Sequence, residues 1–125
     1  MGHKYFLILG AVNAFLAVGL GAFGAHGLKA RLSADMLAVY QTGVQYHFYH
    51  ALGLLLVGML VSQWPTVDLI KIAGWEMFAG IVIFSGSLYL LSITDIRWLG
   101  AITPIGGMAF LVAWLLLVVA FIRLP

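Results

Sequence analysis

The stretch that decides the fold runs from residue 102 to residue 122 and reads ITPIGGMAFLVAWLLLVVAFI. It contains no charged side chain. Its length matches the ~20 residues that a helix needs to cross the hydrocarbon core of a bilayer. We therefore expect a membrane-spanning helix here.

Three further apolar stretches of similar length precede this one, over residues 5–24, 39–61 and 69–93. The connecting segments hold six of the ten charged residues. They are short, so consecutive helices should be antiparallel neighbours. The predicted fold is an all-α integral membrane four-helix bundle with up-and-down connectivity. Both termini then lie on the same side, and residues 1–125 form a single four-span transmembrane domain.

The composition also indicates an integral membrane protein. Hydrophobic residues make up 64% of the chain and charged residues 8%, whereas soluble domains carry about 25% charged residues. So few charges cannot coat a soluble globule of this size. The chain has no cysteine, which excludes disulfides, thiolate metal sites and a cysteine nucleophile. Six basic residues against four acidic ones form no basic patch, so we expect no nucleic-acid partner.

The positive charges do not fix the orientation. The terminal side carries Lys4, Lys71 and Arg123, and the opposite side carries Lys29, Arg31 and Arg97. The positive-inside count is therefore three against three. Dual topology is one interpretation, and the other is that a further determinant such as the free N-terminus decides the orientation. Of the two sides, we place the termini in the cytoplasm.

Small residues form a stripe on three of the spans. These are Gly10, Ala14, Ala17, Gly21 and Gly24 in the first, Ala73, Gly80 and Ser87 in the third, and Gly106, Ala109, Ala113 and Ala120 in the fourth. In lipid, small residues allow helices to pack closely. The stripes predict a tight bundle without a wide pore.

The second span opens with an unusual density of polar groups, because residues 40–50 read YQTGVQYHFYH. At 100° per residue, Tyr46, His47 and His50 share one face, while Gln41 and Gln45 share another. Polar side chains that face lipid are costly, so both faces should meet protein or water.

Depth along the helices, at ~1.5 Å per residue, groups the polar residues into two layers. One layer would contain Asn13, His50 and Glu76, and the other Gln45, His47, Ser87 and Thr103. A proton relay between Glu76 and His50 is one interpretation of the first layer. The alternative is that the third helix begins later and leaves Glu76 at the headgroups, near Lys71.

The histidines raise the question of a metal. His47 and His50 are three residues apart, a spacing that permits a shared metal ion to which His26 or Glu76 could add a ligand. The alternative is that these rings form interhelical hydrogen bonds, since buried polar groups must be paired in any case. Haem is disfavoured because no opposed pair of histidines lies on separate spans at equal depth. The cofactor, if there is one, stays unknown.

Four segments carry a family resemblance: residues 21–28, residues 41–47 with 50–52, residues 84–89 and residues 103–107. In this order they closely resemble the domain of unknown function 423 family, small membrane proteins of bacteria with relatives in animals. The resemblance implies a four-helix bacterial inner-membrane protein, and it implies no activity. The segments contain the polar residues His26, Gln41, Gln45, His47, His50, Ser85, Ser87 and Thr103.

Three hypotheses for the function remain. The first is a non-enzymatic protein whose intramembrane polar cluster binds a small ligand, an ion or a lipid headgroup, for transport or regulation. The candidate ligand-binding residues are Asn13, His26, Gln41, Gln45, His47, His50, Glu76, Ser87 and Thr103. The second is a metal-binding or redox protein that uses His47, His50 and His26. The third is a structural or accessory subunit.

No set of nucleophile, base and acid can be assembled from these residues, so we expect no enzyme. The expected partners are the lipid bilayer, an unidentified small ligand or ion, and further copies of the chain in a homo-oligomer.

Overall fold

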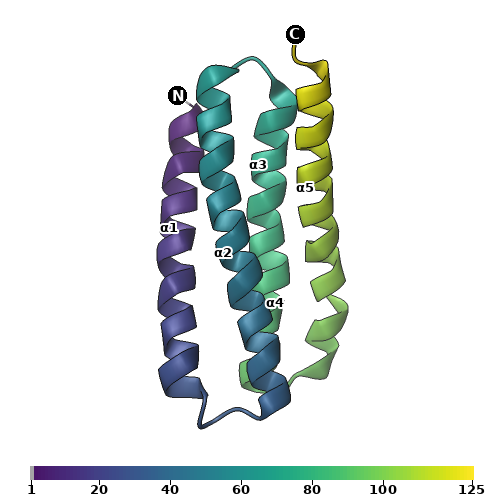
Figure 1. Cartoon of the computed structure of the whole chain (residues 1–125). Coiled ribbons are helices and arrows are strands. Elements are labelled where there is room, and N and C mark those ends of the chain that lie inside the picture. Colours follow the sequence, from purple (N-terminus) through teal and green to yellow (C-terminus); the bar gives the residue numbers. More distant parts are fainter. Residues whose placement is uncertain (1) are drawn as a thin grey trace.

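The computed structural model describes residues 2–125, and all regular elements within this range are helical. They form four antiparallel rods with both termini at one end (Figure 1). The elements in chain order are α1 (Gly2–Phe23), η1 (Gly24–Leu28), α2 (Ala34–Gln63), α3 (Asp68–Gly80), η2 (Ile81–Ser85), α4 (Gly86–Thr94), η3 (Arg97–Ala101) and α5 (Thr103–Arg123). The predicted all-α, up-and-down architecture is confirmed.

Two π-helical turns interrupt the α-helical geometry without breaking the rods. η1 continues α1, and η2 joins α3 to α4 in one third rod. A π-helical turn shifts the register of the following side chains, and such turns occur frequently at functional sites. η3 is a short 3-10 helix that leads into α5.

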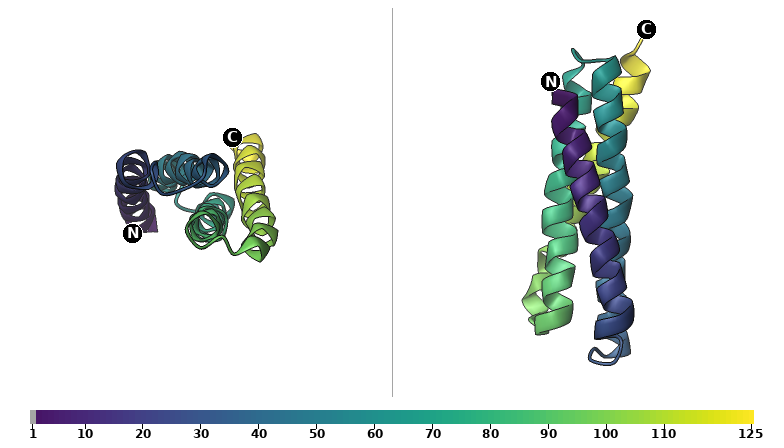
Figure 2. Two further views of the ribbon diagram at one scale, coloured as in Figure 1. Left: turned by 90° about the horizontal axis from the view of Figure 1, so that it is seen from below. Right: turned by 90° about the vertical axis from the view of Figure 1, so that its left-hand side faces the viewer.

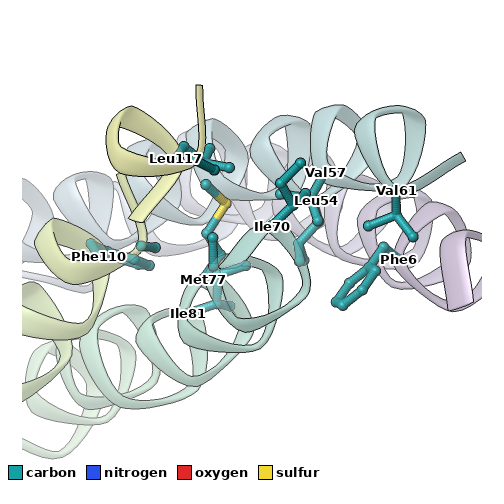
Figure 3. Packing of buried hydrophobic residues seen from close by; sticks show 12 residues of the cluster. Phe6, Leu54, Val57, Val61, Ile70, Met77, Ile81, Phe110 and Leu117 are labelled. Atoms are coloured by element: carbon teal, nitrogen blue, oxygen red, sulfur yellow. The ribbon is translucent and has the colours of Figure 1, made fainter. Parts of the chain in front are cut away.

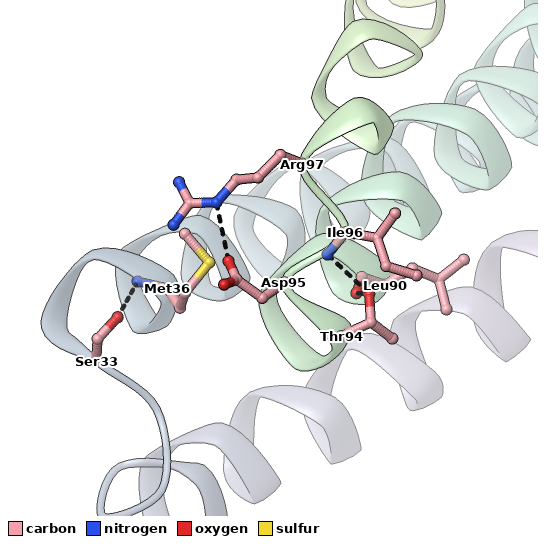
Figure 4. Close-up of polar contacts among 7 residues, drawn as sticks. All are labelled: Ser33, Met36, Leu90, Thr94, Asp95, Ile96 and Arg97. Carbon is pink, nitrogen blue, oxygen red and sulfur yellow. Dashed lines mark hydrogen bonds and ion pairs between the residues drawn. The ribbon is translucent and has the colours of Figure 1, made fainter.

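The rod ends are set by polar residues. α2 begins at Ala34 rather than near residue 39, because the Ser33 hydroxyl accepts a hydrogen bond from the Met36 N–H at 3.2 Å (Figure 4). The third rod ends at Asp95, which has a left-handed φ of 57°. The Asp95 carboxylate pairs with the Arg97 Nε at 2.9 Å (Figure 4). Both side chains are exposed, so this pair adds little stability.

The rods are arranged with α2 and the third rod in the middle. α1 packs mainly on α2, and α5 packs mainly on α3 and η2, so that α1 and α5 lie at opposite sides (Figure 2). The stripes of small residues predicted from the sequence lie largely in these contacts. A Cβ atom at Gly10 would lie 2.8 Å from the backbone nitrogen of Leu55, which shows how closely α1 approaches α2.

An apolar core fills the half of the bundle nearer the termini. It includes Phe6, Leu54, Val57, Val61, Ile70, Met77, Ile81, Phe110 and Leu117 (Figure 3). The outer faces are also apolar, with exposed residues such as Phe15, Leu111 and Ile122. Four helices are long and apolar enough to cross a membrane. Apolar side chains both inside and outside are what a bilayer environment requires.

Candidate functional site

A chain of hydrogen bonds connects three rods in the middle of the bundle. His47 of α2 bonds through Nε2 to the Asn13 Oδ1 of α1 at 2.9 Å, and through Nδ1 to the Tyr89 hydroxyl of α4 at 2.8 Å. The Asn13 Nδ2 donates to the Leu9 carbonyl at 2.8 Å. Asn13 and His47 are buried, with exposed fractions of 6% and 4%.

The partners decide which nitrogen of His47 carries the proton. Since the Asn13 amide nitrogen already donates to a carbonyl, its Oδ1 is the acceptor in the bond to His47. Nε2 of His47 is therefore the donor. Because a charged ring is costly at this buried position, the ring is neutral and its Nδ1 accepts from the Tyr89 hydroxyl. The result is a neutral ring in a directed chain that runs from Tyr89 to Leu9.

Two further bonds hold the rods around this chain. The Tyr40 hydroxyl donates to the Leu20 carbonyl of α1 at 2.5 Å, and its ring packs against Tyr89 with centroids 5.3 Å apart. The Ser85 hydroxyl of η2 donates to the Gly43 carbonyl of α2 at 2.8 Å. Each bond satisfies a polar side chain inside a membrane span, where an unpaired group is costly.

His50 faces a different neighbour. Its Nδ1 donates to the Tyr46 carbonyl at 2.7 Å, and its Nε2 accepts from the Trp114 Nε1 of α5 at 3.0 Å. The ring also stacks on Phe110, with centroids 3.5 Å apart and planes 7° from parallel. A carbonyl can only accept and an indole N–H can only donate, so this neutral ring carries its proton on Nδ1.

A groove between α2, η2 and α5 begins at this histidine. Its volume is about 580 Å³. It is lined by Tyr46, Tyr49, His50, Phe84, Pro104, Gly107, Met108, Phe110, Leu111 and Trp114. The walls are predominantly aromatic and aliphatic, and the groove opens on the outer surface of the bundle. It is thus accessible from the side that faces lipid.

The structure brings together two pairs of the predicted site residues. Asn13 bonds to His47, and the Ser87 hydroxyl lies 2.6 Å from the Thr103 hydroxyl, which ties α4 to α5. The second predicted layer is therefore found in part. The first is wrong in its partners, because Asn13 bonds to His47 and not to His50.

The other candidates lie apart from these pairs. His26 is exposed in η1, and Gln41 and Gln45 are exposed on α2. Glu76 is half-buried on α3, and both ring nitrogens of His50 are bonded to other groups, so that no direct Glu76–His50 relay exists.

The candidate metal ligands are also separated. In residues 2–125, no three His, Cys, Asp or Glu side chains lie close enough to share a metal ion. All four ring nitrogens of His47 and His50 take part in hydrogen bonds, and the two rings point to different helices.

Four residues of the network were missed as site residues in the sequence, namely Tyr40, Ser85, Tyr89 and Trp114. A signal for Trp114 existed. Tryptophan prefers the membrane interface, and a tryptophan in the middle of a span needs a partner for its N–H. Tyr89 offered the same signal through its hydroxyl.

Four long apolar helices with paired polar groups between them define a multi-pass, all-α membrane protein. The chain belongs to the family described as "Protein of unknown function (DUF423)", whose sequence pattern matches residues 20–107. The family resemblance of the four polar segments is thereby confirmed.

Several bacterial membrane proteins are similar over nearly the whole chain. The UPF0382 membrane protein YwdK of Bacillus subtilis is 58% identical over 120 residues, which cover 96% of this chain and 98% of that protein. A UPF0382 membrane protein of Staphylococcus epidermidis is 52% identical over 120 residues, 96% of this chain and 97% of that protein. One from Staphylococcus aureus is 50% identical over 117 residues, 94% of each chain. No solved structure matches the chain.

Proposed function

We propose that this chain is a non-enzymatic protein of the bacterial inner membrane that binds a small amphipathic molecule dissolved in the bilayer. The binding site is the groove between α2, η2 and α5, and binding serves transport or regulation. The observation that carries the proposal is the groove itself, about 580 Å³ in volume and bordered by His50. A concave, mainly apolar site with a few polar groups is the usual form of a small-molecule site.

The chemistry of the lining supports a ligand with an apolar body and one hydrogen-bonding group. Phe84, Phe110 and Leu111 offer apolar contact area. The lining also contains Tyr46 and Tyr49, whose hydroxyls form no hydrogen bond within residues 2–125. A phenol in an apolar groove gains free energy when a ligand supplies its missing partner.

The pairing of the buried polar groups supports a binding role over a reactive one. In residues 2–125, no buried side-chain nitrogen or oxygen lacks a hydrogen-bond partner. Metal binding at His47 or His50 would have to break bonds to Asn13, Tyr89, Tyr46 or Trp114 first. This cost makes the metal hypothesis the weaker one.

The same pairing favours a second candidate function, a structural or accessory subunit. In that case the network locks the rods together and the groove is filled only by lipid chains. The bacterial inner (plasma) membrane is proposed because the similar proteins are bacterial membrane proteins and the spans of this chain are helical. Cytoplasmic termini remain part of the proposal.

The deciding experiment is native mass spectrometry of the protein extracted with its surrounding lipid. Gly107 lines the groove, and a Cβ there would meet only the Phe84 ring, 3.7 Å away at its nearest atom, so Gly107→Leu places a side chain in the groove. Gly19→Leu is the matched control, since a Cβ at Gly19 meets nothing within 4 Å. We expect a stoichiometric bound mass in the wild type and in Gly19→Leu, and its loss in Gly107→Leu.

Two results would contradict the proposal. If the wild-type protein carries no bound mass, the groove binds no ligand, and the structural or accessory role is the candidate function that remains. A bound mass that persists in Gly107→Leu places the ligand somewhere other than in this groove.

A further inference from the structure

Two amide side chains on α2 have no role in the network or in the groove. Gln41 and Gln45 are four residues apart, so they lie one turn above each other on the same helix face. Both are exposed, and neither forms a hydrogen bond within residues 2–125. Gly43 faces α4, and each glutamine is two residues from it, so this face points away from α4 and borders α1.

Gln45 lies inside the candidate membrane span Ala34–Gln63, and Gln41 lies one turn nearer to the start of α2. At ~1.5 Å per residue, Gln45 is roughly 16 Å from the start of α2 at Ala34. Its neighbours on the surface of α2 carry no charge; they are Gln41, Val44, Phe48 and Tyr49. An amide exposed to hydrocarbon loses its hydrogen bonds to water and gains none from acyl chains. The face therefore requires a polar partner.

We propose that this partner is a second copy of the same chain. An amide side chain both donates and accepts hydrogen bonds, so Gln41 and Gln45 complement the same residues of another copy across a two-fold axis. An acyl chain offers no hydrogen-bonding group. A free ion would be left without a charged ligand, because neither cavity beside this face is lined by a charged residue.

The surface next to the glutamines has room for side chains of a neighbouring helix. Two shallow cavities between α1 and α2, of about 310 and 240 Å³, are both lined by Gly21, Val44 and Gln45. The α1 side of the larger one consists of Ala17, Val18, Gly21 and Ala22. Small side chains let the side chains of a second copy approach closely, as in other membrane helix contacts.

The position of the glutamines also fixes the relative orientation of the two copies. Gln45 is roughly 16 Å from the start of α2 but roughly 27 Å from its end at Gln63, at ~1.5 Å per residue. In an antiparallel pair the glutamines would lie in opposite halves of the membrane. The dimer therefore contains two chains of the same orientation, with the axis along the membrane normal.

Cysteine cross-linking tests the interface directly, because the chain has no cysteine of its own. Ala38 is exposed and lies one turn before Gln41 on the same face, near the loop end where water reaches the thiol. Ala101→Cys is the matched control, an exposed alanine at the same end of the bundle near α5. In vesicles of phosphatidylethanolamine and phosphatidylglycerol, we expect oxidation to give covalent dimers of Ala38→Cys in at least tenfold excess over Ala101→Cys.

The role of the amides is tested by Gln41→Leu/Gln45→Leu in the Ala38→Cys background. We expect the dimer yield to fall about tenfold, while Gln63→Leu, the same change at the exposed end of α2, leaves it unaltered. Equal yields from Ala38→Cys and Ala101→Cys would overturn the proposal. So would an unchanged yield in the double leucine variant, or cross-linking in cells to a different protein together with none in vesicles.

Discussion

At the residue scale, His47 and His50 show how neighbours determine the state of a ring. They are three residues apart on α2, but His47 carries its proton on Nε2 and His50 on Nδ1. The difference arises because Asn13 offers an acceptor to His47, whereas Trp114 offers a donor to His50. Both rings are neutral in this arrangement, and both act as connectors between helices.

The opposite tautomers are directly measurable. We expect the ¹⁵N spectrum of histidine-labelled protein in lipid to show one buried ring protonated at Nε2 and the other at Nδ1. His47→Gln and His50→Gln assign the two signals. Trp114→Phe removes the donor to His50 and should shift only the His50 signals. Identical tautomers for the two rings would contradict the bonding pattern.

The pairing of Asn13 with His47 predicts an energetic coupling between the two residues. In a double-mutant cycle with Asn13→Leu and His47→Leu, we expect a coupling of roughly 0.6–2 kcal/mol in the free energy of unfolding, measured in mixed micelles. The matched cycle pairs Asn13→Leu with His50→Leu, and it should be additive to within about 0.5 kcal/mol. A larger coupling to His50 than to His47 would show that the layer predicted from the sequence is right.

The sequence identified the polar residues of this network but not all of their partners. Counting depth from the helix ends treats side chains at one depth as partners. In the structure, a Cβ at Gly10 would meet Leu55 and the Ala51 carbonyl, which places Asn13 at about the depth of His50. The His50 ring nevertheless bonds to Trp114 of α5, and it is His47, one turn away, that bonds to Asn13. The direction in which each ring points depends on how the neighbouring helices pack around α2, which depth along one helix does not show.

At the element scale, the contact between α5 and η2 depends on one glycine. A Cβ at Gly106 would lie 2.7 Å from the Phe84 Cα, so the α5 backbone rests directly on the π-helical turn. The adjacent Gly107 has ordinary space, with its nearest neighbour 3.7 Å away. Two glycines that are equivalent in sequence therefore have different roles in packing.

This difference predicts opposite results from the same substitution. Alanine in place of glycine favours a helix by about 1 kcal/mol, so Gly107→Ala should be neutral or slightly stabilising. Gly106→Ala gains the same helix propensity, but the added methyl group must push η2 away from α5. We therefore expect a net loss of ~1–3 kcal/mol in the free energy of unfolding. Thermal unfolding of the two variants side by side gives the comparison. Equal stability of the two would mean that η2 yields to the added methyl group without cost.

The number and order of the spans could be predicted from the sequence, because an apolar run of about 20 residues has few possible structures other than a membrane-spanning helix. The start of α2 did not, since Ser33 and Asp35 are polar and were counted with the loop. The π-helical turns were not predicted either. They depend on how Ile81–Ser85 meets α2 and α5, and its residues are ordinary for an α-helix in a membrane.

At the scale of the whole molecule, the structure places both termini at one end and leaves the charges evenly divided (Figure 1). Lys4, Lys71 and Arg123 lie at the terminal end, and Lys29, Arg31 and Arg97 at the other. Arg97 is paired with Asp95, but acidic residues have little influence on orientation. Because the charges are balanced, the orientation of the chain in the membrane should change strongly when one or two positive charges are removed.

This balance gives the last prediction. We expect Lys4→Ala/Lys71→Ala to invert the membrane orientation of a large share of the molecules. In this variant, the end opposite the termini carries more positive charges than the terminal end. Lys29→Ala/Arg31→Ala should leave the termini in the cytoplasm. A single cysteine at Leu124 reports the orientation through its reaction with a membrane-impermeant maleimide in intact cells, because the chain has no other thiol.

Labelling in the first variant alone is the expected result, and equal labelling in both variants would show that these charges do not set the orientation. The outcome also bears on the dimer. Gln41 and Gln45 of two copies meet only when both chains have the same orientation, so a population of mixed orientation should form fewer covalent dimers through Ala38→Cys than the wild type. Orientation and assembly can thus be tested in the same cells.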